Sequence, residues 1–291
     1  MTSILTNSAA MSALQTLRDV NTNLASTQDR VSSGLRVGEA ADNVAYWSIS
    51  TTMNSDNKAL NAAKDALGVG AAKVDTAYAA TESAIEVVNE IKAKLVTASE
   101  TSADKTQIQL EITKLNEQLK AVASAASFSG ENWMVIGTDA TREVSVVDGF
   151  IRKDGEVSVT VATSPVATFA MFADSDAGTG GILGTIGTIA LTTTTTQGDI
   201  DDLMDDVEEA LGLLTDSGAA LGALTTRINL QDNFAASLSD SIESGVSRLV
   251  DADMEEESAK LSALQTQQQL AVQSLSIANS SSQNLMTLFR S

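Results

Sequence analysis

Two runs of apolar residues at heptad spacing, one at each end of the chain, most constrain how this sequence can fold. Both runs recur at alternating spacings of three and four residues. A terminal helix with such a stripe must bury it against another helix. We therefore expect the two ends to pair with each other, with other copies of the chain, or both. The C-terminal run is Leu261, Leu264, Gln268, Ala271, Leu275, Ala278, Ser282, Leu285 and Phe289, and the N-terminal run is Leu14, Leu17, Asn21, Leu24, Gln28 and Val31.

Longer heptad runs lie inside the two terminal runs. One extends over residues 49–95 and another over residues 203–242, and a shorter run covers residues 108–126. A helix over residues 49–95 would be about 70 Å long at 1.5 Å per residue. Sustained 3.5-residue periodicity over such a length predicts a left-handed coiled-coil bundle.

The middle of the chain, residues 142–196, has the character of a small β-rich module. Valines alternate with polar residues around position 145 and again over residues 157–161. The pairs Asp148-Gly149 and Asp154-Gly155 are hairpin-turn signals. The threonine run Thr192–Thr196 is typical of a strand edge or a loop.

These patterns predict a mainly α fold with a nearly symmetric layout. The fold is a long coiled-coil helical bundle, formed by both chain ends in a hairpin arrangement, with the small β-rich module in the centre. The expected segments are an N-terminal helix and connector (1–45), the N-terminal half of an outer bundle (46–135), the β-rich central segment (136–198), the C-terminal half of the outer bundle (199–246) and a C-terminal helix (247–291).

Charge and residue inventory exclude several classes of function. The net charge of −20 disfavours nucleic acids and anionic membrane surfaces, whose binding depends on lysine and arginine. The chain has no cysteine and no histidine, which removes zinc sites, thiol nucleophiles and Ser-His triads. We expect no catalytic residue, no cofactor and no metal site, and so no enzyme.

Two smaller features have a structural interpretation. The acidic cluster after Asp251 lacks the glycine of a calcium loop, and Asp253 with Glu256 matches a capping box at the start of the last helix. The adjacent aromatics Tyr46 and Trp47 are expected to pack where a helix begins, and a carbohydrate platform is the alternative.

The segments that flank the terminal helices resemble the signatures of bacterial flagellin. The N-terminal match is Val31, Ser32, Ser33, Gly34, Leu35, Arg36 and Val37, followed by Ala40, Asp42, Asn43, Ala45 and Ile49. The C-terminal match is Ser247, Arg248, Leu249, Asp251, Ala252 and Asp253, followed by Gln267, Gln268, Leu275, Ala278, Asn279, Gln283, Asn284, Leu288, Phe289 and Arg290. The short centre and the region of Trp47 look most like flagellins of the alphaproteobacteria.

The resemblance implies a structural subunit that self-assembles into the helical filament used as a propeller in swimming. The terminal helices would form an inner tube, with a connector to the outer bundle. The connector residues are Ser32, Ser33, Gly34, Leu35, Arg36, Asp42 and Asn43. The expected self-association residues are Leu14, Leu17, Leu24, Val31, Leu261, Leu264, Leu275, Leu285, Leu288 and Phe289.

The implied partners are other copies of the chain or sibling flagellins, the flagellar export apparatus and an export chaperone, and hook-associated junction and cap proteins. No nucleic acid or membrane partner is expected. The location would be the extracellular filament, reached without a cleaved signal peptide, because residues 1–20 lack a basic region followed by a continuous apolar segment. The absence of cysteine and the single proline suit export in an unfolded state.

Three other functions are weighed against the filament subunit. A hook–filament junction protein would share flagellin-like ends and is the main alternative. A peptidase housed in a flagellin-like frame would need zinc-binding histidines, which this chain lacks. An adhesin displayed through residues 142–196 is compatible with a filament subunit.

Overall fold

The computed structural model describes residues 7–137, 141–153, 156–174, 176 and 178–288. The chain divides into two compact units. The terminal unit comprises Met1–Asn57 and Asp240–Ser291, and the central unit comprises Lys58–Ser239. Two long helices, α2 (Val44–Ala98) and α4 (Gln197–Val250), each contribute residues to both units.

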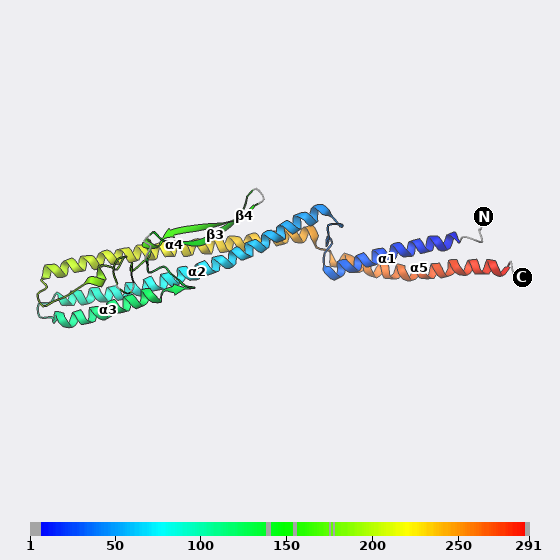
Figure 1. Cartoon of the computed structure of the whole chain (residues 1–291). Helices are drawn as coiled ribbons and strands as arrows, with labels where there is room; N and C mark the ends of the chain where they lie inside the picture. The colour runs from blue at the N-terminus through cyan, green and yellow to red at the C-terminus, as the bar shows by residue number, and fades with distance from the viewer. Residues whose placement is uncertain (1–6, 138–140, 154–155, 175, 177, 289–291) are drawn as a thin grey trace. The chain divides into compact units, whose positions relative to one another are not determined.

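In the terminal unit, helix α1 (Ser8–Ser33) lies beside helix α5 (Met254–Leu288) (Figure 1). Asn7 contacts Ala278 near one end of the pair, and Arg30 contacts Glu257 near the other, so the two helices are antiparallel. The predicted pairing of the two ends of one chain is therefore confirmed. The segment between α1 and α2 packs on the last turns of α4.

The central unit is a bundle of α2, α4 and α3 (Lys105–Ala125). From Leu60 to Leu95, the α2 positions predicted to form a seam are nearly inaccessible, whereas Ile49 at the start of the predicted run is 48% exposed, and Met53 and Asp56 are half-buried. Leu67, Val74 and Ile91 lie at the centre of the buried stretch. Val207, Leu214 and Leu221 of α4 and Ile112 and Leu119 of α3 are equally buried and belong to the same core. The heptad periodicity thus predicts which faces of these helices are buried, because each run keeps one side of its helix apolar.

Two small antiparallel sheets complete the central unit. Strand β1 (Ser127–Phe128) pairs with β2 (Glu131–Asn132), and β3 (Glu143–Lys153) pairs with β4 (Glu156–Pro165) (Figure 1). The short 3₁₀ helices Val166–Thr168 and Ile186–Thr188 follow. Val146 of β3 packs onto the backbone of α2 at Gly70, where a side chain larger than hydrogen would collide with it.

One local prediction needs correction. Asp148-Gly149 is no hairpin turn, because β3 continues through it with a bulge that shifts the register between Val147 and Gly149. Asp154-Gly155 lies outside the described residues. The run Thr192–Thr196 forms a loop with a turn, which is one of the two forms expected from the sequence, and the Thr192 amide donates to the Thr195 hydroxyl over 2.8 Å. Helix α4 continues through Gly245 and extends to Val250.

Candidate functional site

The pair formed by α1 and α5 is the candidate site for self-association, and its ends are defined by caps. The Asn7 side chain accepts a hydrogen bond from the Ala10 amide over 3.0 Å and donates to the Ala278 carbonyl over 3.0 Å. Gly34 ends α1 in the left-handed conformation, with φ of 72°. Asn7 therefore both starts α1 and ties it to α5.

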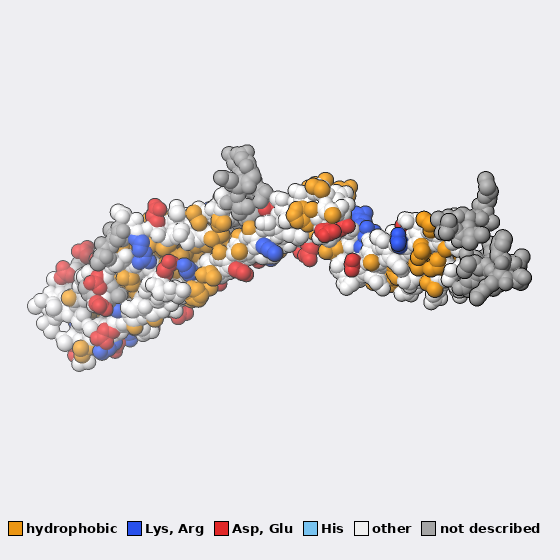
Figure 2. Space-filling model, turned by 45° about the vertical axis from the view of Figure 1, so that its right-hand side comes forward, with side chains coloured by type: hydrophobic (Ala, Val, Ile, Leu, Met, Phe, Trp, Pro, Cys, Tyr) orange, Lys and Arg blue, Asp and Glu red, His pale blue; other side chains and the backbone are white. Residues whose placement is uncertain are grey.

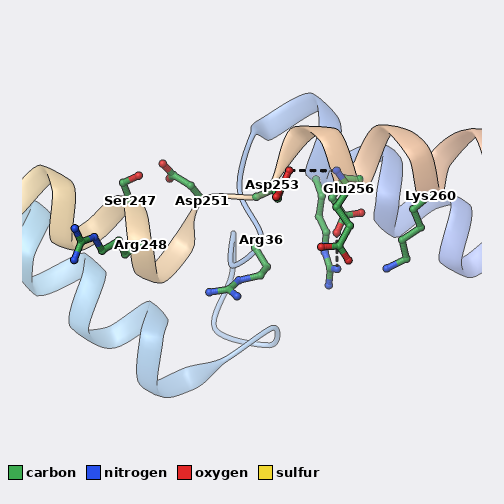
Figure 3. A pocket seen from close by; sticks show the side chains of 10 residues that line it. Arg36, Ser247, Arg248, Asp251, Asp253, Glu256 and Lys260 are labelled. Atoms are coloured by element: carbon green, nitrogen blue, oxygen red, sulfur yellow. Dashed lines mark hydrogen bonds and ion pairs between the residues drawn. The ribbon is translucent and has the colours of Figure 1, made fainter.

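At the start of α5, Asp253 acts as the N-cap. Its Oδ1 accepts from the amide of Glu255 over 3.0 Å and from that of Glu256 over 3.2 Å. The first turn carries three glutamates, Glu255 to Glu257, whose charge is favourable near a helix N-terminus. Figure 3 shows Asp253 and Glu256 next to each other at this helix start.

The seam between the two helices uses every described position predicted on α5 but only half of those predicted on α1. On α5, Leu264 and Ala271 are buried, and Leu261, Gln268, Leu275 and Ala278 are half-buried. On α1, the half-buried Leu17, Leu24 and Val31 alternate with the buried Val20 and Thr27. Of the expected residues, Leu14, Asn21 and Gln28 are exposed, and the side chains of Leu285, Leu288 and Phe289 lie outside the described residues.

The correction on α1 has a simple physical reason. The two possible seams share Leu17, Leu24 and Val31 and differ in the positions between them. The seam that faces α5 takes Val20 and Thr27, one residue before Asn21 and Gln28, and so keeps the strongly polar amides at its edge. There, the Gln268 amide donates to Asn21 Oδ1 over 2.7 Å.

One ion pair joins the two helices next to the connector. Arg30 Nη1 lies 3.3 Å from Glu257 Oε1, and the Glu257 side chain is only 10% exposed. The second carboxylate oxygen, Oε2, is buried and has no hydrogen-bond partner among the described residues. Arg30 is therefore the main compensation for a buried charge.

The connector, residues 34–43, attaches to the chain where α4 ends and α5 begins. The amides of Arg36 and Val37 donate to the Val250 carbonyl over 2.6 and 3.2 Å, and the Ala252 amide donates to the Gly34 carbonyl over 2.9 Å. Val37, Val246 and Val250 form a small buried cluster of their own. These bonds join residues 34–37 to residues 250–252, two segments that are more than 200 residues apart in sequence. We call this pair of segments the clamp.

Two further connector residues organise its turn and the start of α2. Asp42 Oδ2 accepts from the amides of Gly38 and Glu39 over 3.0 and 3.2 Å, and these two bonds, led by that from Glu39, lower the pKa of the Asp42 carboxyl. Asn43 Oδ1 accepts from the Tyr46 amide over 3.1 Å and so caps α2. Ser32 and Ser33 instead belong to the last turn of α1.

A charged cavity of about 450 Å³ lies beside the clamp (Figure 3). Arg36, Arg248 and Lys260 line it together with Asp251 and Glu256, and opposite charges balance around it. Within the described part of the chain, no three acidic side chains converge as a metal site would require.

The outer faces of α1 and α5 carry apolar side chains that the pair itself leaves uncovered. They are Met11 and Leu14 on α1 and Leu270, Val272 and Ile277 on α5, the last with 68% of its surface exposed. Figure 2 shows exposed apolar side chains on these helices. An apolar face on both sides of a two-helix pair points to further packing partners.

The distribution of charged residues along the sequence gives a second indication of the self-association surface, independent of the heptad spacing. No charged residue lies between Lys260 and Arg290, and none lies between the chain start and Arg18. In a chain with a net charge of −20, copies repel each other wherever acidic residues meet. The uncharged stretches of the two terminal helices, residues 8–17 of α1 and 261–288 of α5, are therefore suitable surfaces for contact between copies. No helix among the described residues has the length and apolar content needed to cross a bilayer.

Comparison with known proteins agrees with this architecture. The model of the bacterial flagellin N-terminal helical region matches residues 4–135, and that of the flagellin C-terminal helical region matches residues 204–289. This chain belongs to the bacterial flagellin family. It is a structural subunit of the extracellular flagellar filament, which this family assembles from copies of itself.

Individual relatives place the flagellin among those of the alphaproteobacteria. It is 49% identical to Flagellin C and 43% identical to Flagellin A of Rhizobium meliloti strain 1021, and 46% identical to a flagellin of Brucella melitensis biotype 1. Each alignment covers the whole of both chains. All three are named as flagellins, and nothing among them favours a junction protein. Residues 136–203 lie between the two matched regions.

Proposed function

We propose that α1 and α5 drive filament growth by folding and associating in the same step. Two helices that bury a single seam between them gain little to offset the entropy of ordering about 60 residues. Their outer apolar faces become buried when other copies arrive. Each large apolar side chain then contributes about 1.5–3 kcal/mol.

The observation that carries this proposal is the exposed apolar surface on the uncharged stretches of α1 and α5, residues 8–17 and 261–288. Met11 and Ile277 are 64% and 68% exposed in the subunit, although α1 and α5 already form a pair. Head-to-tail contacts that repeat without closing add the same burial at every step and so produce a filament rather than a closed ring.

In this proposal the parts of the chain have separate roles. Residues 1–45 and 247–291 form the inner layer of the filament, with residues 34–43 as the connector. Residues 46–135 and 199–246 form the outer bundle, and residues 136–198 face solvent. Support comes from the clamp of the connector on Val250 and from the separate core of the central unit.

A charge on the outer face of α5 tests the proposal. We expect Ile277→Asp to leave the subunit folded, because the side chain is exposed there, and to stop elongation from filament seeds. Leu110→Asp is the matched control, since this leucine of α3 is also exposed and receives the same charge. Electron microscopy and a sedimentation assay measure elongation. Normal filaments from Ile277→Asp, or from a chain truncated after Asp251, would show that the proposal is wrong.

We also propose that the chain reaches the filament by export in an unfolded state. The chain has no cysteine that could form a disulfide and only one proline, which suits passage through a narrow export channel in an unfolded state. The partners would be the flagellar export apparatus and an export chaperone, and later the junction and cap proteins. In cells without the export apparatus the chain should stay inside, and its secretion from such cells would contradict this route.

A further inference from the structure

The described methionine side chains differ widely in how far they are open to solvent. Met134 and Met171 are fully buried in the core of the central unit, and Met134 Sδ also accepts a hydrogen bond from the Thr81 hydroxyl over 3.7 Å. Met11 of α1 is 64% exposed, and Met254 of α5 is 43% exposed. A reagent dissolved in water therefore reaches the side chains of Met11 and Met254 more readily than those in the core.

The two exposed methionines have different surroundings within the terminal unit. Met11 lies on the outer face of α1, in the uncharged stretch before Arg18. Leu14, which is 39% exposed, follows three residues later and so lies on the same side of the helix. Met254 instead follows the N-cap Asp253 and precedes three glutamates. Met11 therefore belongs to an apolar surface and Met254 to a charged one.

Oxidation converts a methionine from an apolar side chain into a polar one. A sulfur lone pair attacks one oxygen of hydrogen peroxide, and the S–O bond forms as the O–O bond breaks. The proton of the transferred hydroxyl passes to the departing hydroxide, so the thioether becomes a sulfoxide while the peroxide is reduced to water. Burying the sulfoxide oxygen against apolar side chains without a hydrogen-bond donor is unfavourable. A sulfoxide at Met11 is thus tolerated in the free subunit and disfavoured in an apolar contact.

We infer that Met11 is an oxidation site that controls assembly. Hydrogen peroxide converts it to the sulfoxide in the free subunit, and the oxidised subunit adds poorly to a filament. This inference rests on the proposed association through the outer faces of α1 and α5. Incorporation covers Met11 and ends its sensitivity to peroxide. The block is reversible, because thiol-dependent reductases return methionine sulfoxide to methionine.

The first measurement is peptide mass spectrometry after brief treatment with hydrogen peroxide. In free subunits, Met11 and Met254 should form sulfoxide quickly, and Met134 and Met171 should stay reduced, because their side chains are fully buried. In filaments grown before treatment, Met11 should oxidise far more slowly than in the subunit. Equal oxidation of Met11 in subunit and filament would overturn the inference.

The second measurement is seeded growth of peroxide-treated subunits, followed by sedimentation and electron microscopy. Oxidation should raise the critical concentration of wild type and of Met254→Leu at least about tenfold, and Met11→Leu should stay close to its untreated value. Incubation with methionine sulfoxide reductases for both sulfoxide epimers and dithiothreitol should restore growth of oxidised wild type. Met11→Gln carries a permanent polar group and should grow poorly without peroxide, while circular dichroism shows a folded subunit.

The variants separate the failure of this inference from the failure of the proposed function. Loss of growth of treated Met11→Leu would assign the effect to another methionine and overturn the inference. If oxidised wild type and Met11→Gln grow normally while Ile277→Asp is blocked, the role of Met11 is wrong and assembly through α1 and α5 stands. Normal growth of Ile277→Asp would instead contradict the proposed function itself.

Discussion

At the scale of single residues, glycine positions show how closely the central unit is packed. Gly68 and Gly70 lie two residues apart on α2, yet the surroundings of the two glycines differ completely. A methyl group at Gly70 would collide with Val146 Cγ1, whereas a methyl group at Gly68 meets nothing within 4 Å. The same glycine-to-alanine change should therefore have opposite effects at the two positions.

We expect Gly68→Ala to stabilise the central unit by up to about 1 kcal/mol, the difference in helix propensity between the two residues. Gly70→Ala gains the same propensity but forces β3 away from α2, and overpacking costs about 1–3 kcal/mol. Urea unfolding of both variants measures the two free energies of unfolding. A stabilised Gly70→Ala would mean that the hairpin is not held against α2.

The Asp42 carboxyl makes the stability of the connector depend on pH. Its folded-state pKa lies below the unfolded value because the carboxylate accepts two backbone hydrogen bonds. A group with a lowered pKa contributes stability above the unfolded value of about 3.9 and loses it as the pH falls through the folded value.

We expect Asp42→Ala to lower the melting temperature of the terminal unit at pH 5–7, with a difference from wild type that shrinks towards pH 2. Melting curves followed by circular dichroism across this range provide the measurement. A difference that stays constant with pH would show that the Asp42 charge does not hold the turn.

At the scale of elements, one ion pair between α1 and α5 contributes to holding the two helices together. Arg30 faces Glu257, whose carboxylate is nearly buried and has one oxygen without a partner among the described residues. Removing one member of a buried pair leaves an uncompensated charge, which costs more than removing both members.

We expect Arg30→Met to destabilise the pair by about 1–3 kcal/mol, because the buried carboxylate loses its partner. Glu257→Gln should be milder, and the double variant should recover part of the loss of Arg30→Met. A double-mutant cycle from urea unfolding measures the coupling. Simple additivity of the two changes would show that the ion pair contributes nothing.

At the scale of the whole molecule, the two units should differ in stability before assembly. The central unit has a continuous core of helices, hairpin and loops, while the terminal unit has two helices with one seam and a cluster of three buried valines. Local stability follows the number of buried apolar contacts.

Hydrogen exchange on free subunits should therefore be fast in α1 and α5 and slow around Val74, Ile91 and Leu214. In filaments, α1 and α5 should gain at least about a hundredfold protection, equivalent to roughly 2.7 kcal/mol, since other copies then cover their outer faces. Mass spectrometry of both states measures this difference. Equal protection of α5 in the two states would contradict coupled folding and association.

The sequence by itself determined the helices and, in the central unit, their buried faces. Alternation of three and four residues places Leu60 and Val74 on one side of α2, and Leu214 on one side of α4, when the helices coil around one another, so the core of the bundle could be predicted. The cap at Asp253 follows equally from local chemistry, because an N-cap bonds only to the amides just after it.

Only the tertiary structure decided which of two overlapping stripes on α1 faces its partner. Leu17, Leu24 and Val31 belong to both stripes, and the choice of Val20 over Asn21 depends on where α5 lies. The same holds for the bulge at Gly149 and for the clamp of Val37 on Val250. These features arise between segments far apart in sequence, and periodicity along one segment carries no information about the surface that another segment presents to it.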